Sequence, residues 1–286
     1  MTLAGITEQP EDGPVPRWTN PEWQRRFPWL VQGTTGQGDA EDPFDLGLSG
    51  AAPVGRVLER WRALGRATGM ARLVHARQVH AADLCGHGGA GPPGLLLMEG
   101  VDGHLTRRSG VLLTVSVADC VPVSLVDPER RAVALLHAGW RGAAAGIVER
   151  AITRLAEEFG SIAADLWLHC GPAICGDCYE VGPEVHRALR PAADPPPAPT
   201  PVNLRAAIAE RATAAGVPPR QITLSNHCTR CGPGAFFSHR GGSPARQMGF
   251  LGIRELGGAP WADSVIGSRR HHTTLNKRRR GCTLRP

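Results

Sequence analysis

Aromatic residues, cysteines and long apolar runs are all scarce in this chain of 286 residues. Aromatic side chains make up 5% of it, and it contains eight cysteines. Eight cysteines are too few for a disulfide scaffold in a chain of this length, so we expect reduced thiols that are available as metal ligands. No stretch has the length of a membrane-spanning helix, and no charged-then-apolar signal peptide opens the sequence. We therefore expect a cytoplasmic protein with no membrane partner.

Paired histidines are also missing. The chain has 11 histidines but no His-x-His, and its one adjacent pair is His271-His272. A multicopper oxidase binds its coppers largely through such pairs, so oxygen reduction at four coppers is excluded. A set of two histidines and one cysteine can still hold a single copper ion.

The positive charge is unevenly distributed. Seven of the Lys and Arg residues lie between Arg269 and Arg285, where no acidic residue occurs. Taking these seven away from the net charge of +6 leaves −1 for the rest of the chain. The body is therefore close to neutral, and nucleic acid is expected as a partner only through the basic end.

Hydrophobic residues at 42% and charged residues at 20% are typical of a globular protein. Candidate strands and helices alternate, which favours one α/β domain over residues 31–256. We expect residues 1–30 to be an extended lead-in, and residues 257–286 to be a disordered basic tail. The patterns predict helices over about 53–67, from Gly142 to 159, 183–189 and 203–216. They predict strands over 73–79, 111–117, 121–126, 131–137, 165–170, 221–225 and 248–253.

Three potential metal ligands stand at the ends of predicted strands. They are His80, Cys120 and His137. Two imidazoles and one thiolate make a suitable set for Zn²⁺ that leaves a fourth position open. The spacing alone is a weak signal, because the three residues are 40 and 17 positions apart, and it favours two core histidines and a buried thiol.

Four further cysteines form two C-x₂-C pairs. The pairs are Cys175 with Cys178 and Cys228 with Cys231. Such pairs fit a second, structural zinc, although the gap between them is longer than in usual zinc ribbons. The alternative is that the pairing is coincidental.

Seven ordered motifs together resemble one known family. The motifs are Gln78-Val79-His80, Ala118-Asp119-Cys120-Val121-Pro122, His137-Ala138-Gly139-Trp140-Arg141-Gly142, Gly171-Pro172-Ala173-Ile174, Cys178-Tyr179-Glu180-Val181-Gly182, Cys228-Thr229 and Phe237-Ser238-His239-Arg240. The family is known variously as laccase-domain proteins, multicopper polyphenol oxidases, peptidoglycan editing factors and purine nucleoside phosphorylases. The resemblance covers residues 31–254. It implies a single-domain four-layer α/β/β/α sandwich with mixed sheets, and metal binding by His80, Cys120 and His137.

The same resemblance implies zinc-dependent chemistry on purine nucleosides. The reactions are phosphorolysis of adenosine, inosine and methylthioadenosine, and deamination of adenosine by a metal-bound hydroxide. Arg141, expected at the N-terminus of a helix, and Arg240 are our candidates for binding phosphate. Asp119 is expected either to act as an acid or base or to orient a ligand histidine. We also place Gln78 among the substrate-binding residues.

Two departures from the family pattern affect the substrate site. The segment Thr34-Thr35-Gly36-Gln37-Gly38 lacks the arginine that the family usually carries, and Asp45-Leu46-Gly47 replaces its usual Asn-Leu-Gly. The preferred substrate of this chain is thus open.

Two other functions remain as alternatives. One is a cysteine hydrolase that edits peptidoglycan precursors, with Cys120 as nucleophile and His137 or His80 as base. The other is a non-enzymatic metal-binding scaffold whose basic tail docks on a partner.

Overall fold

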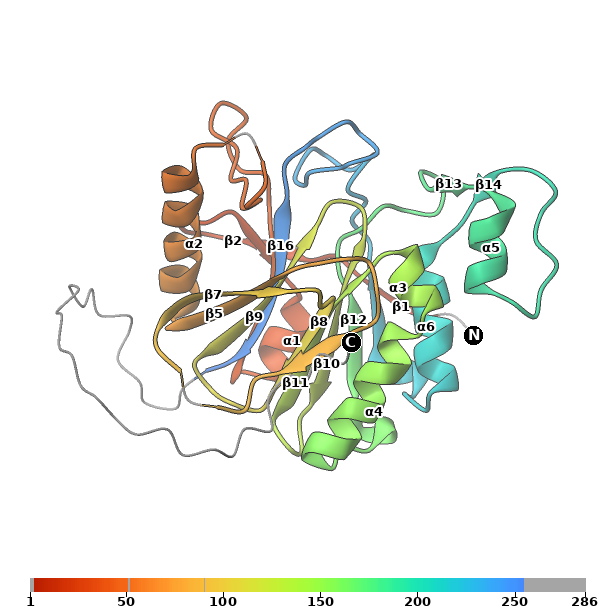
Figure 1. The fold of residues 1–286 in the computed structure, drawn as a ribbon, viewed down its shortest axis with the longest axis horizontal. Coiled ribbons are helices and arrows are strands. Elements are labelled where there is room, and N and C mark those ends of the chain that lie inside the picture. Colours follow the sequence, from red (N-terminus) through yellow and green to blue (C-terminus); the bar gives the residue numbers. More distant parts are fainter. Residues whose placement is uncertain (1–2, 51, 90, 255–286) are drawn as a thin grey trace, which may run out of the picture.

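Two seven-stranded sheets form the centre of the molecule (Figure 1). The computed structural model describes residues 3–50, 52–89 and 91–254. The first sheet has the order β1 (Ala4–Ile6), β15 (Ile222–Ser225), β12 (Trp167–Cys170), β10 (Val121–Asp127), β11 (Ala132–Ala138), β8 (Gly103–Thr106) and β6 (Leu84–Gly86). The second has the order β2 (Gln9–Glu11), β3 (Arg17–Thr19), β4 (Leu30–Thr35), β16 (Gln247–Ile253), β9 (Val111–Val117), β5 (Arg72–Arg77) and β7 (Gly94–Glu99).

Six α-helices accompany the two sheets in the part of the chain that the structure describes. They are α1 (Pro21–Arg26), α2 (Val54–Thr68), α3 (Trp140–Ala144), α4 (Ile147–Phe159), α5 (Pro183–Leu189) and α6 (Leu204–Ala214). Helix α2 packs Trp61 and Leu64 against Phe250 on the second sheet, while α4 and α6 pack against the first sheet. Between the sheets, Leu113 and Leu135 belong to one shared core. The expected α/β/β/α sandwich of mixed sheets is confirmed, and Figure 1 shows α2 on the side opposite α4 and α6.

Alternation of apolar residues explains these layers. On β9, Leu112 faces the core under α2, while Leu113 faces the other sheet. Successive side chains of a strand point to opposite faces, so a strand covered on both sides is a continuous apolar run. Strands β10 and β11 are buried along their whole length for the same reason.

The helix predicted from Gly142 to Phe159 is two helices. Helix α3 is five residues long, and Gly146 adopts a left-handed conformation (φ 82°) before α4 begins. Glycine takes this conformation without the steric cost that a Cβ would add. The prediction of a single helix was wrong, because the apolar periodicity of the sequence continues across the turn at Gly146.

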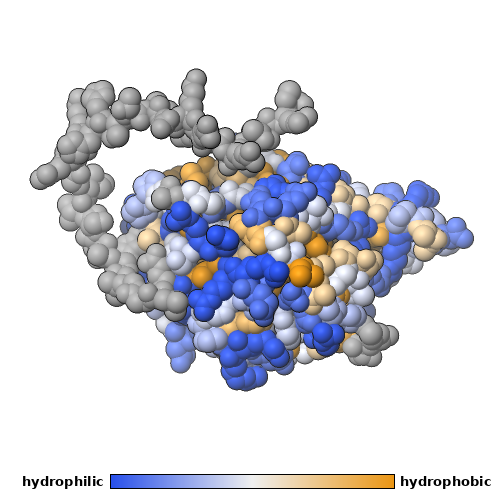
Figure 2. All heavy atoms as spheres, turned by 90° about the horizontal axis from the view of Figure 1, so that it is seen from below, coloured by the Kyte–Doolittle hydropathy of each residue, from blue (hydrophilic) through white to orange (hydrophobic). Residues whose placement is uncertain are grey.

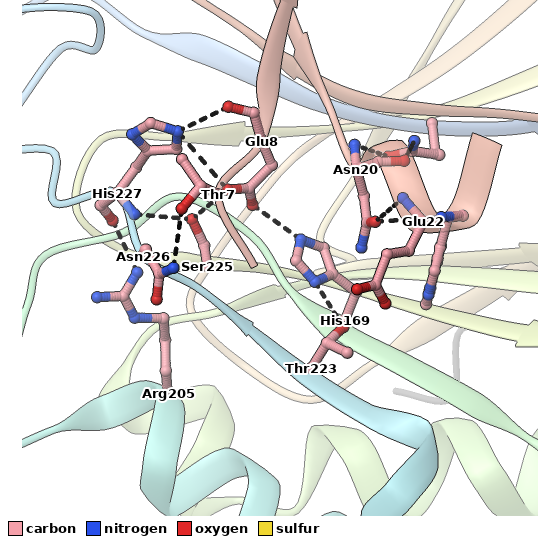
Figure 3. Close-up of polar contacts among 12 residues, drawn as sticks. Thr7, Glu8, Asn20, Glu22, His169, Arg205, Thr223, Ser225, Asn226 and His227 are labelled. Atoms are coloured by element: carbon pink, nitrogen blue, oxygen red, sulfur yellow. Dashed lines mark hydrogen bonds and ion pairs between the residues drawn. The ribbon is translucent and has the colours of Figure 1, made fainter. Parts of the chain in front are cut away.

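Residues 3–30 contribute three short strands and helix α1 to the fold and are not an extended lead-in. Strand β1 pairs in parallel with β15, and β3 pairs with β4. Glu8, in the link between β1 and β2, accepts from Ser225 Oγ (2.8 Å) and contacts His169 Nε2 (2.9 Å), as Figure 3 shows. Sequence periodicity missed this segment because its strands have three residues each. The predicted basic tail, residues 257–286, lies outside the described residues.

The surface is mainly polar. On the face shown in Figure 2, hydrophobic residues form small patches among hydrophilic ones. Exposed large apolar side chains such as Val54 and Ile162 are scattered along the chain, which is usual for a protein surface. Within the described ranges, none of the helices combines the length and apolarity needed to cross a bilayer.

A short ribbon completes the fold. Strand β13 (Glu180–Val181) pairs with β14 (Thr200–Pro201). The ribbon brackets α5 and the proline-rich loop that follows it, and Figure 1 shows this unit projecting from the two-sheet body.

Candidate metal centre

The three predicted ligands meet where the chain leaves three strands. His80 follows β5, Cys120 lies in the crossing from β9 of one sheet to β10 of the other, and His137 is near the end of β11. One ligand atom from each of these residues lies within 4.8 Å of the others. Cys120 Sγ is 4.0 Å from His80 Nε2, and the two imidazole rings lie 4.7 Å apart, nearly perpendicular.

Strained backbone surrounds this group. Three described non-glycine residues have positive φ, and two of them are His80 (φ 60°) and Asp119 (φ 87°), next to Cys120. Residues other than glycine rarely have a positive φ, so the surrounding structure must hold the backbone of His80 and Asp119 in this conformation. Gly139 leaves the room that the ligands need, because a Cβ there would lie 3.0 Å from Cys120 Sγ.

Asp102 is the residue that holds His80 and His137 together. Its Oδ2 accepts from the backbone N–H groups of Val79 (3.2 Å) and Ala81 (2.8 Å). Its Oδ1 accepts from His80 N (2.9 Å) and from His137 Nδ1 (2.9 Å). A carboxylate on one ring nitrogen fixes the imidazole and directs the other nitrogen to a metal. No pattern in the sequence pointed to Asp102 as an orienting residue, and we did not predict its role.

The charges of the site reinforce one another. Burial opposes ionisation of Cys120, but the neighbouring His137 and His80 lower the pKa of its thiol to about 6. Burial also lowers the pKa of His137, but the thiolate of Cys120 and the carboxylate of Asp102 outweigh it and raise that pKa to about 9. Burial opposes the charge of Asp102 as well, yet hydrogen bonds from His137 and Ala81 hold its pKa below the usual value. The site therefore favours a thiolate, which is the form that binds metal.

A pocket of about 670 Å³ opens onto the three ligands. Its wall includes Gln78, His239, Arg246 and the segment from Gly47 to Gly50. The Asp45-Leu46-Gly47 departure thus lies beside this pocket. Asp45 Oδ1 accepts from Gly47 N (2.8 Å) and Arg246 N (2.9 Å). These bonds link the Asp45-Leu46-Gly47 segment to the residue before β16. The involvement of His239 and Arg246 in the wall was not predicted.

Gln78 is fixed to the neighbouring strand. Its Nε2 donates to Ser116 O (2.9 Å) and its Oε1 accepts from Ser116 N (2.6 Å). The side chain lines the pocket, but its amide also closes the end of β5 against β9.

The hydrogen bonds of the Asp119 carboxylate go to loop residues and not to His80 or His137. Its Oδ1 accepts from Thr229 Oγ1 (2.6 Å) and Ser238 Oγ (2.8 Å), and its Oδ2 accepts from Arg240 N (2.6 Å). The expectation that Asp119 orients a ligand histidine was wrong, because Asp102 occupies that place. Instead, Asp119 gathers two distant loops around Cys120.

Arg141 and Arg240 lie near Tyr179. The guanidinium of Arg240 stacks over the ring of Tyr179 at 5.1 Å, and that of Arg141 over Trp140 at 4.3 Å. Burial and the charge of Cys120 raise the pKa of Tyr179 to about 12, against the opposing effect of the two arginines. The helix expected to support Arg141 ends after five residues, so the predicted helix dipole adds little there.

The two C-x₂-C pairs form a second group, the four-cysteine cluster. The sulfur atoms of its members lie within 4.8 Å of one another: Cys175, Cys178, Cys228 and Cys231. Burial raises the pKa of Cys228, but backbone N–H groups outweigh it and lower that pKa to about 7.

Residues 33–254 match the family described as multi-copper polyphenol oxidoreductase laccase. The chain belongs to this family. It is 34% identical to the purine nucleoside phosphorylase YlmD of Geobacillus stearothermophilus over 80% of this chain and 92% of that protein. It is 39% identical to the adenosine deaminase RL5 of an unknown prokaryotic organism over 50% of this chain and 58% of that protein.

Solved structures of the family share this fold. The crystal structure of YlmD from Geobacillus stearothermophilus superposes with a TM-score of 0.78 at 31% identity, over 87% of this chain and all of that one. The structure of Bacillus licheniformis YfiH gives 0.76 at 27% identity, over 85% and 98%. Membership of this family agrees with the prediction of an enzyme.

Proposed function

We propose that this chain is a zinc enzyme acting on purine nucleosides. Its reactions would be phosphorolysis of adenosine, inosine and methylthioadenosine, and deamination of adenosine. One observation carries the proposal: His80, Cys120 and His137 converge on a pocket of about 670 Å³. The names of the relatives support the choice of substrate.

The three side chains fit zinc rather than a hard cation. Two imidazoles and a thiolate are ligands that zinc favours, and three protein ligands leave one position open. Asp102 holds His137 by Nδ1, which leaves Nε2 as its ligand atom. If these residues hold zinc, the ion would act as a Lewis acid and would lower the pKa of a water molecule to about 7.

Two polar side chains keep the ligands in place. Gln78, two residues before His80, closes the end of β5 through its two hydrogen bonds to Ser116. Asp119 holds the loops of Thr229 and Ser238 beside Cys120. We assign both a positioning role, since their hydrogen-bonding atoms are occupied by the protein.

Phosphorolysis needs a place for an anion. In this reaction the bond between C1′ and the base breaks, a phosphate oxygen bonds to C1′, and the departing base gains a proton. Arg141 and Arg240, both exposed and both close to Tyr179, are the cations that we assign to phosphate. The guanidinium of Arg240 donates from Nη1 to Glu180 O (3.0 Å), and the backbone N–H of Arg240 donates to Asp119 Oδ2 (2.6 Å).

One observation favours a second candidate, a cysteine hydrolase. Cys120 contacts His137, and His137 contacts Asp102. This is the arrangement of a nucleophile, a base and an orienting carboxylate. A thiolate bound to zinc is a poor free nucleophile, so metal dependence separates the two functions.

The deciding experiment removes the metal from the intact protein and then restores zinc. The zinc enzyme should lose nucleoside turnover on chelation and regain it with zinc. Nucleoside turnover that survives chelation would contradict the zinc enzyme. Hydrolysis of a peptidoglycan precursor that survives chelation and is abolished by alkylating Cys120 would instead support the cysteine hydrolase.

A further inference from the structure

The four-cysteine cluster is assembled by two parallel strands. Strands β12 and β15 are adjacent and parallel, with Cys170 opposite Leu224. Parallel neighbours end at the same edge of a sheet, so the loops that follow them meet. An isolated bridge between Ala173 and Cys228 continues the pairing into these loops. The topology therefore brings together cysteine pairs whose nearest members are 50 residues apart in the sequence.

The spacing of the sulfur atoms is compatible with a tetrahedral metal site, since all four lie within 4.8 Å of one another. Cys175 Sγ and Cys231 Sγ are 3.8 Å apart. Four sulfurs at the usual Zn–S distance of about 2.3 Å occupy the corners of a tetrahedron with edges of about 3.8 Å. The sulfurs of a disulfide would instead lie about 2.05 Å apart.

Backbone groups prepare the cluster for charge. Cys228 Sγ accepts hydrogen bonds from Cys175 N (3.2 Å), Arg230 N (3.4 Å) and Cys231 N (3.4 Å). The Arg230 side chain donates to Cys178 O (3.1 Å), which links the two loops and brings a positive charge. Gly232 closes the second turn, where a Cβ would lie 2.3 Å from Cys228 O.

We propose that the four-cysteine cluster binds a second zinc ion, with a structural role, separate from the His80–Cys120–His137 centre. Tetrahedral coordination by four thiolates is typical of structural zinc and leaves no open position for substrate. The ion would fasten the two loops that hold Asp119. Thr229, next to Cys228, donates to the Asp119 carboxylate, and Ile174, next to Cys175, donates its N–H to Asp119 O (3.2 Å). This site does not depend on the proposed nucleoside chemistry.

The test counts metal in the full chain, purified under reducing conditions with zinc. Elemental analysis should give two zinc ions per chain for the wild type and one for Cys178→Ser/Cys231→Ser. The variant His80→Ala/Cys120→Ala should also keep one, and its zinc X-ray absorption spectrum should show four sulfurs at about 2.3 Å. Cys85→Ala, which lies outside both groups, is the matched control and should keep two.

Several results would overturn the proposal. One is a count of one zinc ion per chain in the wild type, together with the same count in Cys178→Ser/Cys231→Ser. Another is a spectrum of His80→Ala/Cys120→Ala without sulfur-only coordination, or iron in place of zinc. The third is a metal-free cluster whose cysteines are disulfide-linked by mass spectrometry. The wild-type count and the His80→Ala/Cys120→Ala spectrum decide the matter even if the double cysteine variant does not fold.

Discussion

Asp102 links the backbone of the His80 loop to the ring of His137. It is buried and accepts four hydrogen bonds through its two oxygens. Such a carboxylate decides both where one ligand stands and which nitrogen of the other is available. At the scale of single residues, Asp102 is the side chain that positions two of the three proposed ligands.

Replacing Asp102 by Asn tests this dependence. The amide has one acceptor oxygen where the carboxylate has two, so one pair of the N–H groups loses its partner. We expect zinc affinity at the His80–Cys120–His137 centre to fall about 10- to 100-fold, measured by competition with a chelator. Asp83→Asn, an exposed neighbour paired with Arg150, is the control and should bind zinc as the wild type does. An unchanged affinity in Asp102→Asn would remove Asp102 from the centre.

Arg141 and Arg240 should matter more for phosphate than for nucleoside. In Arg141→Ala and in Arg240→Ala, we expect the KM for phosphate to rise about tenfold or more, because a charge-assisted contact is worth about 1.5–3 kcal/mol. Deamination, which consumes water and no phosphate, should fall less. Initial rates of both reactions in the same samples give the comparison. Arg150→Ala, an exposed arginine on α4, is the control. Equal losses in both reactions would contradict the assignment.

At the scale of elements, β1 and the link to β2 are held by a buried acid. Burial would raise the pKa of Glu8, but the hydrogen bond and charge of His169 and the hydroxyl of Ser225 bring it below its usual value of 4.5. A lowered folded-state pKa means that Glu8 stabilises the fold above pH 4.5 and that this contribution is lost as the pH falls through the folded-state value.

Glu8→Gln tests this contact. At pH 7 the variant should lose about 1–3 kcal/mol of stability, since a buried polar contact is weakened. The difference in Tm between wild type and variant should shrink as the pH falls below 4.5, which thermal unfolding across pH measures. The exposed Glu184→Gln is the matched control. A difference in Tm that does not change with pH would contradict the role of the Glu8 charge.

Sequence patterns predicted the long elements better than the short ones. Apolar runs such as β9 and β11, and the amphipathic α2, lie within about two residues of the predicted ranges, whereas α4 ends at the predicted residue but begins five residues later than predicted. Residues 3–30 were missed because strands of three residues carry almost no periodicity. For the metal centre, the ligands were predicted from the sequence, but the role of Asp102 and the contact of Tyr179 with Arg240 were not. Their roles arise from contacts between distant strands and loops, which no local pattern encodes.

At the scale of the whole molecule, several imidazoles are buried in the body. Burial lowers the pKa of His75 and that of His87 to about 4 each, and it lowers that of His104 as well. Because the unfolded chain takes up these protons near pH 6.5, stability should fall as the pH drops from about 6.5 towards 4. Denaturant unfolding of the wild type and of His75→Gln should show a shallower fall in the variant. An equal slope in both would contradict the role of His75.

The direct test of the central claim is product analysis with adenosine and phosphate. Zinc-replete wild type should release adenine and ribose-1-phosphate, with inosine from deamination, and Cys120→Ala should form none of them above background. Absence of all three products with the wild type, or full turnover by Cys120→Ala, would contradict the claim that this chain acts on purine nucleosides at the His80–Cys120–His137 centre.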